Sequence, residues 1–437
     1  MVGAALAWLA SPSDAHAATC TFEQKQTRTA SLAAFQRSAA DAKRTYFRKH
    51  ASAKQRATFV KAQQKKLRAL RAAAGCSVPP LPPSSAASCS FMLAPNAENE
   101  RFTGGYATLY NEGPNQPGLV LSSLGHVNAV MLFVDFADRP GSGSIPDYGA
   151  LHTAHTKFFE EASYGRFSLS VTVVDRWFRM PQPSTYYNPF SAHHFEFFEQ
   201  AIRAADPYVN FGQYDFVFFG ASNGTILANR PTGPKPGYGV LADGKEIRFA
   251  AVIDSDVRRF GTNASFPFNH EFSHTLGLPD LGSSATGWDP MAATGPAPWP
   301  SGAHFVGWHK WKLGWLDPPQ LTCLQAPGKL EETLTPIAVA GGKKLVVVPI
   351  TDSIAYVVEV RRPIGYDKFA CEEGVLLYSV DSQLLQGSPL LAVKGPPACG
   401  VASPGALATG ETFEDSQVKV EVLATDGRDY RVRVTKK

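Results

Sequence analysis

The chain has 437 residues, of which 44% are hydrophobic and 18% charged, with a formal net charge of +4. This length allows two or three domains with a sizeable core, and the 33 prolines and 37 glycines predict many loops. No stretch beyond the first residues is long and apolar enough to span a bilayer, which excludes a transmembrane helix.

Residues 1–17 have the features of a secretory signal peptide. An apolar run from Val2 to Ala10 precedes an A-x-A-like end at Ala15–Ala17, so we expect cleavage after Ala17. No Lys or Arg precedes the apolar run, and the alternative is a frayed N-terminus. We therefore expect an exported, extracellular protein.

The cysteines agree with export. Their number is even and no C-x-x-C spacing occurs, so disulfides are expected rather than a cysteine metal site. The spacing does not determine the pairing; the expected pairs, each of which brackets a plausible structural unit, are Cys20–Cys76, Cys89–Cys323 and Cys371–Cys399. The alternative is that some of these cysteines are free and buried.

Residues 18–76 differ in composition from the rest of the chain. They contain no proline, and the apolar spacing predicts two helices joined near His50–Ser52. Fourteen Lys or Arg against two Asp or Glu give this hairpin a charge of +12, and the rest of the chain therefore carries −8. A pro-segment that docks on an acidic body, an anchor to an anionic cell envelope, and a solvated hairpin without a partner all fit this charge. No aromatic residues or motifs support nucleic-acid binding.

Residues 77–88 form a Pro/Ser linker, and residues 89–320 are expected to be an α/β domain. The expected strands are Val130–Phe136, Phe167–Phe178 (as a strand and hairpin), Asp215–Gly220 and Phe249–Ile253, and the expected helices are Tyr148–Ser163, His193–Ala205 and one beginning near Pro267.

The helix near Pro267 carries the sequence H-E-x-x-H. His270 and His274 are four residues apart, so on a helix they lie on one face and can bind one metal ion. Glu271 is placed to act as general base toward a water molecule that the metal activates. Gly277 permits a sharp turn, after which Asp280 can supply a third ligand.

A methionine, Met291, follows in Trp288-Asp289-Pro290-Met291, where zinc proteases with the longer motif have a methionine turn beneath the metal. Two imidazoles and one carboxylate suit Zn²⁺ and leave a fourth position for water, as a catalytic site requires. The alternative is a buried helix whose histidines only satisfy hydrogen bonds.

Other histidines and aspartates give weaker signals. The adjacent His193 and His194 cannot share a helix face, and His304 and His309 lie in a tryptophan-rich stretch expected to pack beneath the site. Four aspartates are candidates either for Ca²⁺ sites or for the capping of loops and turns: Asp135, Asp138, Asp254 and Asp256.

Residues 321–437 are expected to form a β-sandwich, because short β-branched runs alternate with turn-forming residues. The expected strands are Lys344–Pro349, Ala355–Arg361, Gly374–Val380, Val418–Leu423 and Tyr430–Val434. This domain shows no evident chemistry and is expected to support the catalytic domain or to bind substrate.

The chain resembles the immune-inhibitor-A-like family of secreted bacterial metalloproteases. The resemblance covers Asn128–Asp381 and is carried by His270–Leu281, Trp288–Gly295, Gly307–Pro318, Asn128–Pro140, Glu160–Pro181 and Tyr356–Asp381. It implies a zincin-like, metzincin-type catalytic domain and a secreted zinc endopeptidase that acts on proteins or peptides. It also allows Asp280 as third ligand in place of the commoner histidine.

Two other functions remain open. One is a secreted cell-surface or substrate-binding protein with an inactive protease fold, although the intact His270, Glu271 and Met291 argue against it. The other is an esterase or amidase that uses the same metal.

Overall fold

The computed structural model describes residues 62, 111–115, 120–141, 145, 149–187, 193–222, 224–225, 239–253, 265–283, 285–292, 303–384, 391–395, 397–398 and 403–437. The expected signal peptide, the linker and, except for the helical Ala62, the basic hairpin lie outside these residues. Ser85–Lys437 forms one compact unit, separate from Met1–Ser84, and the description below concerns this unit.

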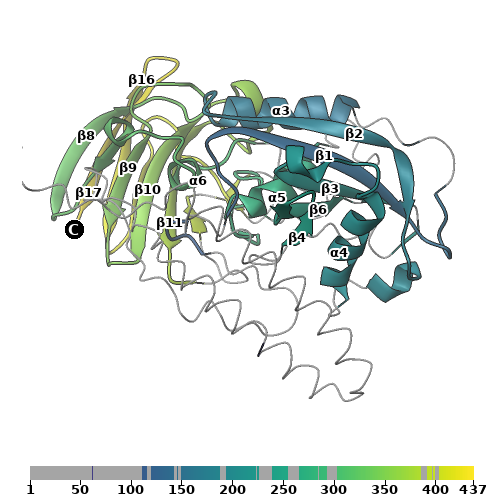
Figure 1. Cartoon of the computed structure of the whole chain (residues 1–437). Helices are drawn as coiled ribbons and strands as arrows, with labels where there is room; N and C mark the ends of the chain where they lie inside the picture. The colour runs from purple at the N-terminus through teal and green to yellow at the C-terminus, as the bar shows by residue number, and fades with distance from the viewer. Residues whose placement is uncertain are drawn as a thin grey trace, which may run out of the picture. The chain divides into compact units, whose positions relative to one another are not determined.

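A four-stranded parallel sheet forms the first half of the unit (Figure 1). Its strand order is β2-β1-β3-β6, with β1 at Gly125–Asp135, β2 at Phe167–Arg179, β3 at Phe216–Ala221 and β6 at Ala250–Ile253. The helices of this half are α3 (Gly149–Ala162), α4 (His194–Ala205) and α5 (Phe266–Thr275), and a small ribbon pairs β4 (Val240–Ala242) with β5 (Lys245–Ile247).

Helices cover both faces of this sheet. Alternate residues of β1 point to opposite faces, so Met131 and Phe133 pack with Phe159 of α3 and Phe272 of α5. Their neighbours Leu132 and Val134 pack with α4 through a second cluster that includes Phe197 and Phe198. Burial on both faces explains why β1 is a nearly continuous apolar run.

The predicted strands and helices of this half are confirmed in position, with one correction. Phe167–Phe178 is not a strand and hairpin, because β2 is one strand of 13 residues that pairs parallel with β1. The register shifts once, between Met131 and Phe133, and the strand continues beyond the shift to Arg179. The β-branched alternation belongs to a long edge strand with partly exposed residues.

Two sheets form the second half. One has the order β12-β11-β10-β9-β7 and the other β15-β16-β17-β8. The strands are β7 (Leu321–Cys323), β8 (Gly328–Leu334), β9 (Leu345–Pro349), β10 (Ile354–Arg361), β11 (Gly374–Asp381), β12 (Leu391–Lys394), β15 (Thr412–Glu414), β16 (Val418–Thr425) and β17 (Tyr430–Lys436), with a short ribbon of β13 (Pro397–Ala398) and β14 (Ser403–Pro404). All five predicted strands are present.

The two sheets pack face to face around valines. Val346 and Val358 of the first sheet share a core cluster with Val420 and Val432 of the second, so this half is a sandwich. Cys323 and Cys371 are both disulfide-bonded. The other four cysteines lie outside the described residues, so the three pairs stay predictions.

The five-stranded sheet is also covered on its other face. Val347 of β9 and Tyr378 of β11 belong to the same core cluster as Phe272 of α5 and Trp315. Helix α6 (Gly307–Lys312) lies between the two halves: Gly307 N donates to Glu359 Oε2 at 2.6 Å, on β10. The two halves therefore share one core.

A buried lysine lies at this junction. Lys310 of α6 is fully buried, and its Nζ donates to Ile337 O at 3.1 Å, an oxygen that also accepts from Tyr164 Oη at 2.5 Å. Burial lowers the pKa of Lys310 from 10.5 to about 7, although the carboxylate of Asp367 opposes this shift. The folded state thus loses this proton at a lower pH than the unfolded state does.

Because the pKa of Lys310 differs between the folded and unfolded states, the free energy of unfolding depends on pH. Between pH 7 and 10.5 the unfolded chain binds the Lys310 proton more tightly, so the cost of the buried charge is complete below pH 7 and fades as pH rises. Lys310→Met is expected to raise the free energy of unfolding at pH 6 relative to wild type, and this gain should shrink by about 3 kcal/mol at pH 9. Urea unfolding at both pH values measures it, with the exposed Lys329→Met as control. A gain that is the same at both pH values would contradict the assignment.

Candidate metal centre

Helix α5 presents the predicted metal ligands from a fully buried position. All ten of its residues are buried, and Pro267 lies in its first turn, where no backbone donor is needed. The helix ends at Thr275, with Leu276 as its C-cap, and Gly277 has a φ of +93°, which glycine adopts without strain. This turn returns the chain so that Asp280 faces the helix again.

The two imidazoles converge on one carboxylate oxygen. Asp280 Oδ1 lies 3.1 Å from His270 Nε2 and 3.4 Å from His274 Nε2. The ring centroids of the two histidines are 4.8 Å apart, and the three candidate ligand atoms all lie within 4.8 Å of one another. The histidines are nearly buried, whereas the Asp280 side chain is 39% exposed, so solvent reaches the site from the carboxylate side.

Each histidine is held through its other ring nitrogen. His270 Nδ1 lies 2.8 Å from Pro290 O, and His274 Nδ1 lies 2.9 Å from Leu278 O. A carbonyl oxygen can only accept, so both Nδ1 atoms carry the proton and donate. In the neutral ring this leaves the Nε2 lone pairs directed at Asp280, as metal ligands require.

The pKa values of His274 and Asp280 show that the two side chains interact strongly, as groups that bind one cation do. Burial alone would lower the pKa of His274, but the Asp280 carboxylate outweighs burial and raises this pKa to about 9. Burial would raise the pKa of Asp280, but the two imidazoles hold it below its ordinary value. The raised pKa favours a proton on the His274 ring, whose charge balances the Asp280 carboxylate, and a metal ion that binds there would displace this proton.

The donor set fits zinc. A tetrahedral ion with bonds of about 2.0–2.1 Å separates its ligand atoms by about 3.3–3.4 Å, close to the 3.1 and 3.4 Å separations found here. Two nitrogens and one carboxylate oxygen are typical protein ligands of Zn²⁺ in catalytic sites.

Glu271 lies beside the ligands and is itself buried. Its Oε1 is 4.0 Å from His270 Nε2, and the whole residue is 4% exposed. Burial raises the pKa of Glu271, while the two neighbouring imidazoles oppose the shift. A carboxylate with a raised pKa is a stronger proton acceptor, which suits a general base.

Met291 lies in a loop that contacts the ligand segment directly. Its side chain is fully buried, and its carbonyl oxygen accepts from Leu281 N at 2.9 Å, one residue after Asp280. The residue before it, Pro290, supplies the carbonyl that binds His270. The structure thus brings together all five predicted site residues: His270, Glu271, His274, Asp280 and Met291.

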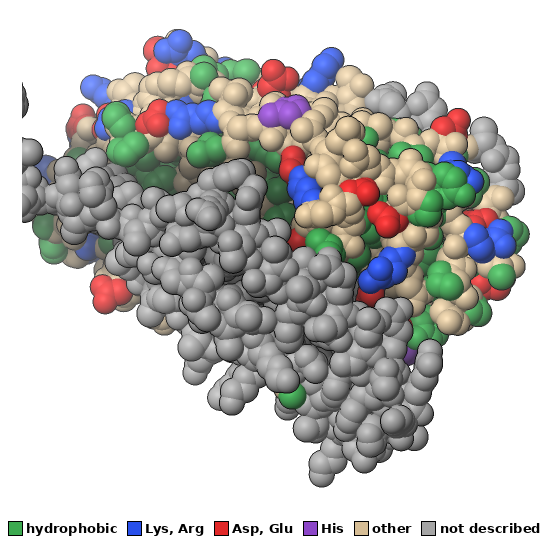
Figure 2. All heavy atoms as spheres, viewed as in Figure 1, with side chains coloured by type: hydrophobic (Ala, Val, Ile, Leu, Met, Phe, Trp, Pro, Cys, Tyr) green, Lys and Arg blue, Asp and Glu red, His purple; other side chains and the backbone are tan. Residues whose placement is uncertain are grey.

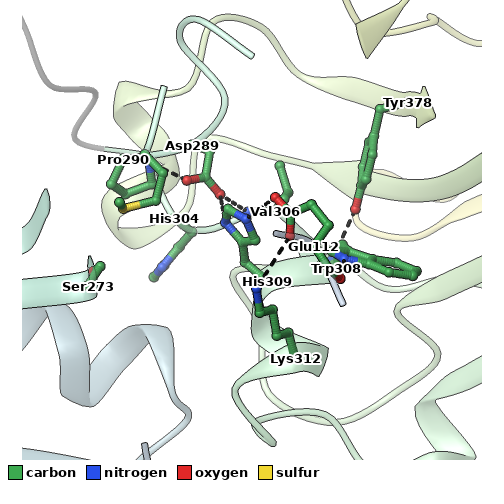
Figure 3. A network of polar contacts seen from close by, with 12 residues as sticks. Glu112, Ser273, Asp289, Pro290, His304, Val306, Trp308, His309, Lys312 and Tyr378 are labelled. Carbon is green, nitrogen blue, oxygen red and sulfur yellow. Dashed lines mark hydrogen bonds and ion pairs between the residues drawn. The ribbon is translucent and has the colours of Figure 1, made fainter. Parts of the chain in front are cut away.

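Sequence reasoning missed a charged network behind this loop (Figure 3). Asp289 accepts from His309 Nδ1 at 2.9 Å, and His309 Nε2 lies 3.0 Å from Glu112 Oε1. Asp289 could have been noticed because it adjoins Pro290 and Met291. Glu112 gives no signal, since it is a single glutamate in a turn-like Asn-Glu-Gly-Pro-Asn sequence.

The remaining candidates bind protein groups other than the metal ligands. Asp135 binds Arg179 Nε at 2.7 Å and Gly141 N at 2.8 Å, and Asp138 caps Ser184 N at 2.8 Å. His304 is buried against Glu161, with Nε2 2.8 Å from its Oε1.

Of the adjacent histidines, His193 lies against Tyr186, with the two ring centroids 4.0 Å apart. Asp254 and Asp256 lie outside the described residues.

Comparison with protein-family models and with curated proteins finds no match for this chain. Among the residues that the structure describes, none of the helices has the length and apolar character to cross a membrane.

Proposed function

We propose that the chain is a secreted zinc-dependent endopeptidase. The observation that carries this proposal is the approach of His270 Nε2 and His274 Nε2 to a single oxygen of Asp280, with both Nδ1 atoms donating to backbone carbonyls. If these histidines only satisfied hydrogen bonds, there would be no reason for two imidazoles and a carboxylate to meet at the spacing of metal ligands beside the buried Glu271.

The roles of the residues follow from their positions. When bound, Zn²⁺ polarises the scissile carbonyl and makes water more acidic. His270, His274 and Asp280 would hold it, and the partly exposed Asp280 side leaves an approach for substrate. Glu271 accepts a proton at its carboxylate from the attacking water and delivers it to the leaving amine nitrogen. Met291 is buried and would form the hydrophobic floor of the site without acting as a ligand.

Several features support the zincin-like, metzincin-type fold and the secreted location. A parallel sheet precedes the ligand helix, and a buried methionine loop contacts the segment after it. Disulfide bonds at Cys323 and Cys371 suit an oxidising compartment. Acidic and basic side chains are interspersed on the part of the described surface that Figure 2 shows. The excess of Lys and Arg over Asp and Glu is found in residues 18–76 of the sequence.

A chelation experiment tests the proposed function. The purified chain is expected to hold about one zinc ion and to cleave denatured casein, and phenanthroline should abolish cleavage because it removes the metal. Added Zn²⁺ should restore the activity. Metal analysis and a gel assay measure the two quantities.

The other functions give different results in this experiment. Hydrolysis of model esters without cleavage of casein would favour the esterase. Full zinc loading with no hydrolysis of either would favour the binding protein, and a chain that holds no zinc would refute the metal centre.

A further inference from the structure

Asp289 fixes the loop that orients His270. It is fully buried, and its Oδ1 accepts from Met291 N at 2.7 Å, while its Oδ2 accepts from Val306 N at 2.8 Å and from His309 Nδ1 at 2.9 Å. Three donors on one carboxylate leave it little freedom to rotate. Pro290 lies between Asp289 and Met291, so the same contacts fix its carbonyl, which binds His270 Nδ1.

His309 lies between two carboxylates, as Figure 3 shows. Its ring nitrogens are 2.9 Å from Asp289 Oδ2 and 3.0 Å from Glu112 Oε1, and all three side chains are fully buried. Burial would lower the pKa of His309, but the two carboxylates outweigh it and raise this pKa to about 10. The ring is therefore a cation at neutral pH and donates to both carboxylates.

A fourth charge balances the cluster. Lys312 Nζ lies 3.9 Å from Glu112 Oε2, and burial lowers the pKa of Lys312 to about 8, so it is still charged at neutral pH. Two cations and two anions thus share one buried site, which offsets the cost of removing each charge from water.

Glu112 comes from a segment that belongs to none of the sheets. The segment Asn111–Asn115 precedes β1, and Trp308 Nε1 donates to Glu112 O at 3.1 Å. Asn115 Nδ2 donates to Leu276 O at 2.7 Å, at the turn between His274 and Asp280. A Cβ on Gly277 would lie 2.3 Å from Asn115 Oδ1, so the absence of a side chain at Gly277 lets the segment approach this turn.

We propose that Glu112 is a positioning residue of the metal centre. Its carboxylate anchors His309, His309 and Val306 fix Asp289, and Asp289 holds the Pro290 carbonyl that orients the His270 imidazole. This inference rests on the proposed function, because it requires that His270 binds the metal. Partners of metal-bound histidines typically change metal affinity tenfold to hundredfold when they are altered.

The test measures metal binding rather than catalysis. Glu112→Gln keeps the shape of the side chain and removes its charge, and it is expected to weaken Zn²⁺ binding to the full chain about tenfold, measured by competition with a chelator of known affinity. Bound Co²⁺ should show altered visible bands, because the His270 ring is less firmly oriented. Glu112→Asp keeps the charge and should recover part of the affinity.

A buried carboxylate elsewhere provides the matched control. Asp135 on β1 is buried and accepts from Arg179 Nε at 2.7 Å and from Gly141 N at 2.8 Å, and these partners are not part of the network of Glu112, His309 and Asp289. Asp135→Asn should lower the free energy of unfolding and leave the zinc affinity of the folded protein within about twofold of wild type. A merely structural role for Glu112 predicts this same behaviour for Glu112→Gln.

The outcomes separate the two proposals. If wild type binds zinc and Glu112→Gln binds it equally well with an unchanged Co²⁺ spectrum, Glu112 does not position the metal, while the proposed function stands. If wild type binds no zinc, the proposed function itself fails. Should Glu112→Gln not fold, His309→Gln, which removes the cation between Glu112 and Asp289, replaces it in the comparison with wild type, and equal zinc affinity of these two would overturn the inference.

Discussion

Glu271→Gln is expected to lower the kcat/KM for peptide cleavage by about 10²–10⁴-fold while zinc stays bound. Glutamine has the same shape but cannot accept the proton of the attacking water. His270, His274 and Asp280 keep their positions, since the substitution adds no volume to the buried site. Cleavage of a fluorogenic peptide and metal analysis of the same preparation measure the two effects.

Glu199→Gln is the control for this substitution. Glu199 lies on α4, is 46% exposed at its side chain and pairs with Arg203, so its loss should leave cleavage unchanged. Wild-type cleavage by Glu271→Gln would show that another group takes the proton. Loss of both cleavage and zinc would show instead that Glu271 supports the ligands.

His274→Ala is expected to remove zinc as well as activity. The substitution deletes one of three ligands, so its effect on affinity should exceed the roughly hundredfold that outer partners of a ligand produce. It also leaves the Asp280 carboxylate with a single imidazole neighbour, His270. Metal analysis after gel filtration should give a zinc content near zero, and casein cleavage should be at background.

His193→Ala serves as the control, because His193 lies beside Glu196 at the start of α4 and away from the ligands. It should keep zinc and activity. A His274→Ala protein that retains a full zinc ion would exclude this histidine as a ligand.

The sequence predicted those parts of the molecule that depend on local spacing. His270 and His274 are one helical turn apart, and Asp280 follows after a glycine turn, so a short stretch determines how the three approach each other. Strand β1 was predictable for a similar reason, because burial on both faces requires a continuous apolar run. The partner of a strand is not local, and the true pairing of β2 with β1 was therefore missed.

The charged network could not be predicted for the same physical reason. His309 and Glu112 are 197 positions apart in sequence and meet only because the chain folds back beneath the methionine loop. Glu112 lies in no recognisable pattern, and the tryptophan-rich stretch that contains His309 does not reveal which carboxylates that histidine binds, since a buried ion pair is the exception among charged residues. Only the three-dimensional arrangement reveals that Asp289 and its partners lie behind His270.

The sheet that contains β9, β10 and β11 has one face against the valine-rich sandwich core and the other against the α6 side of the ligand half. A protease that nicked the chain near residue 320 and released the C-terminal part would uncover Leu345, Val347 and Tyr378 together. Both fragments would then expose large apolar surfaces, which favour aggregation. Cleavage at that position would therefore separate two halves that bury a common core, and the ligand half would lose the sheet against which α6 packs.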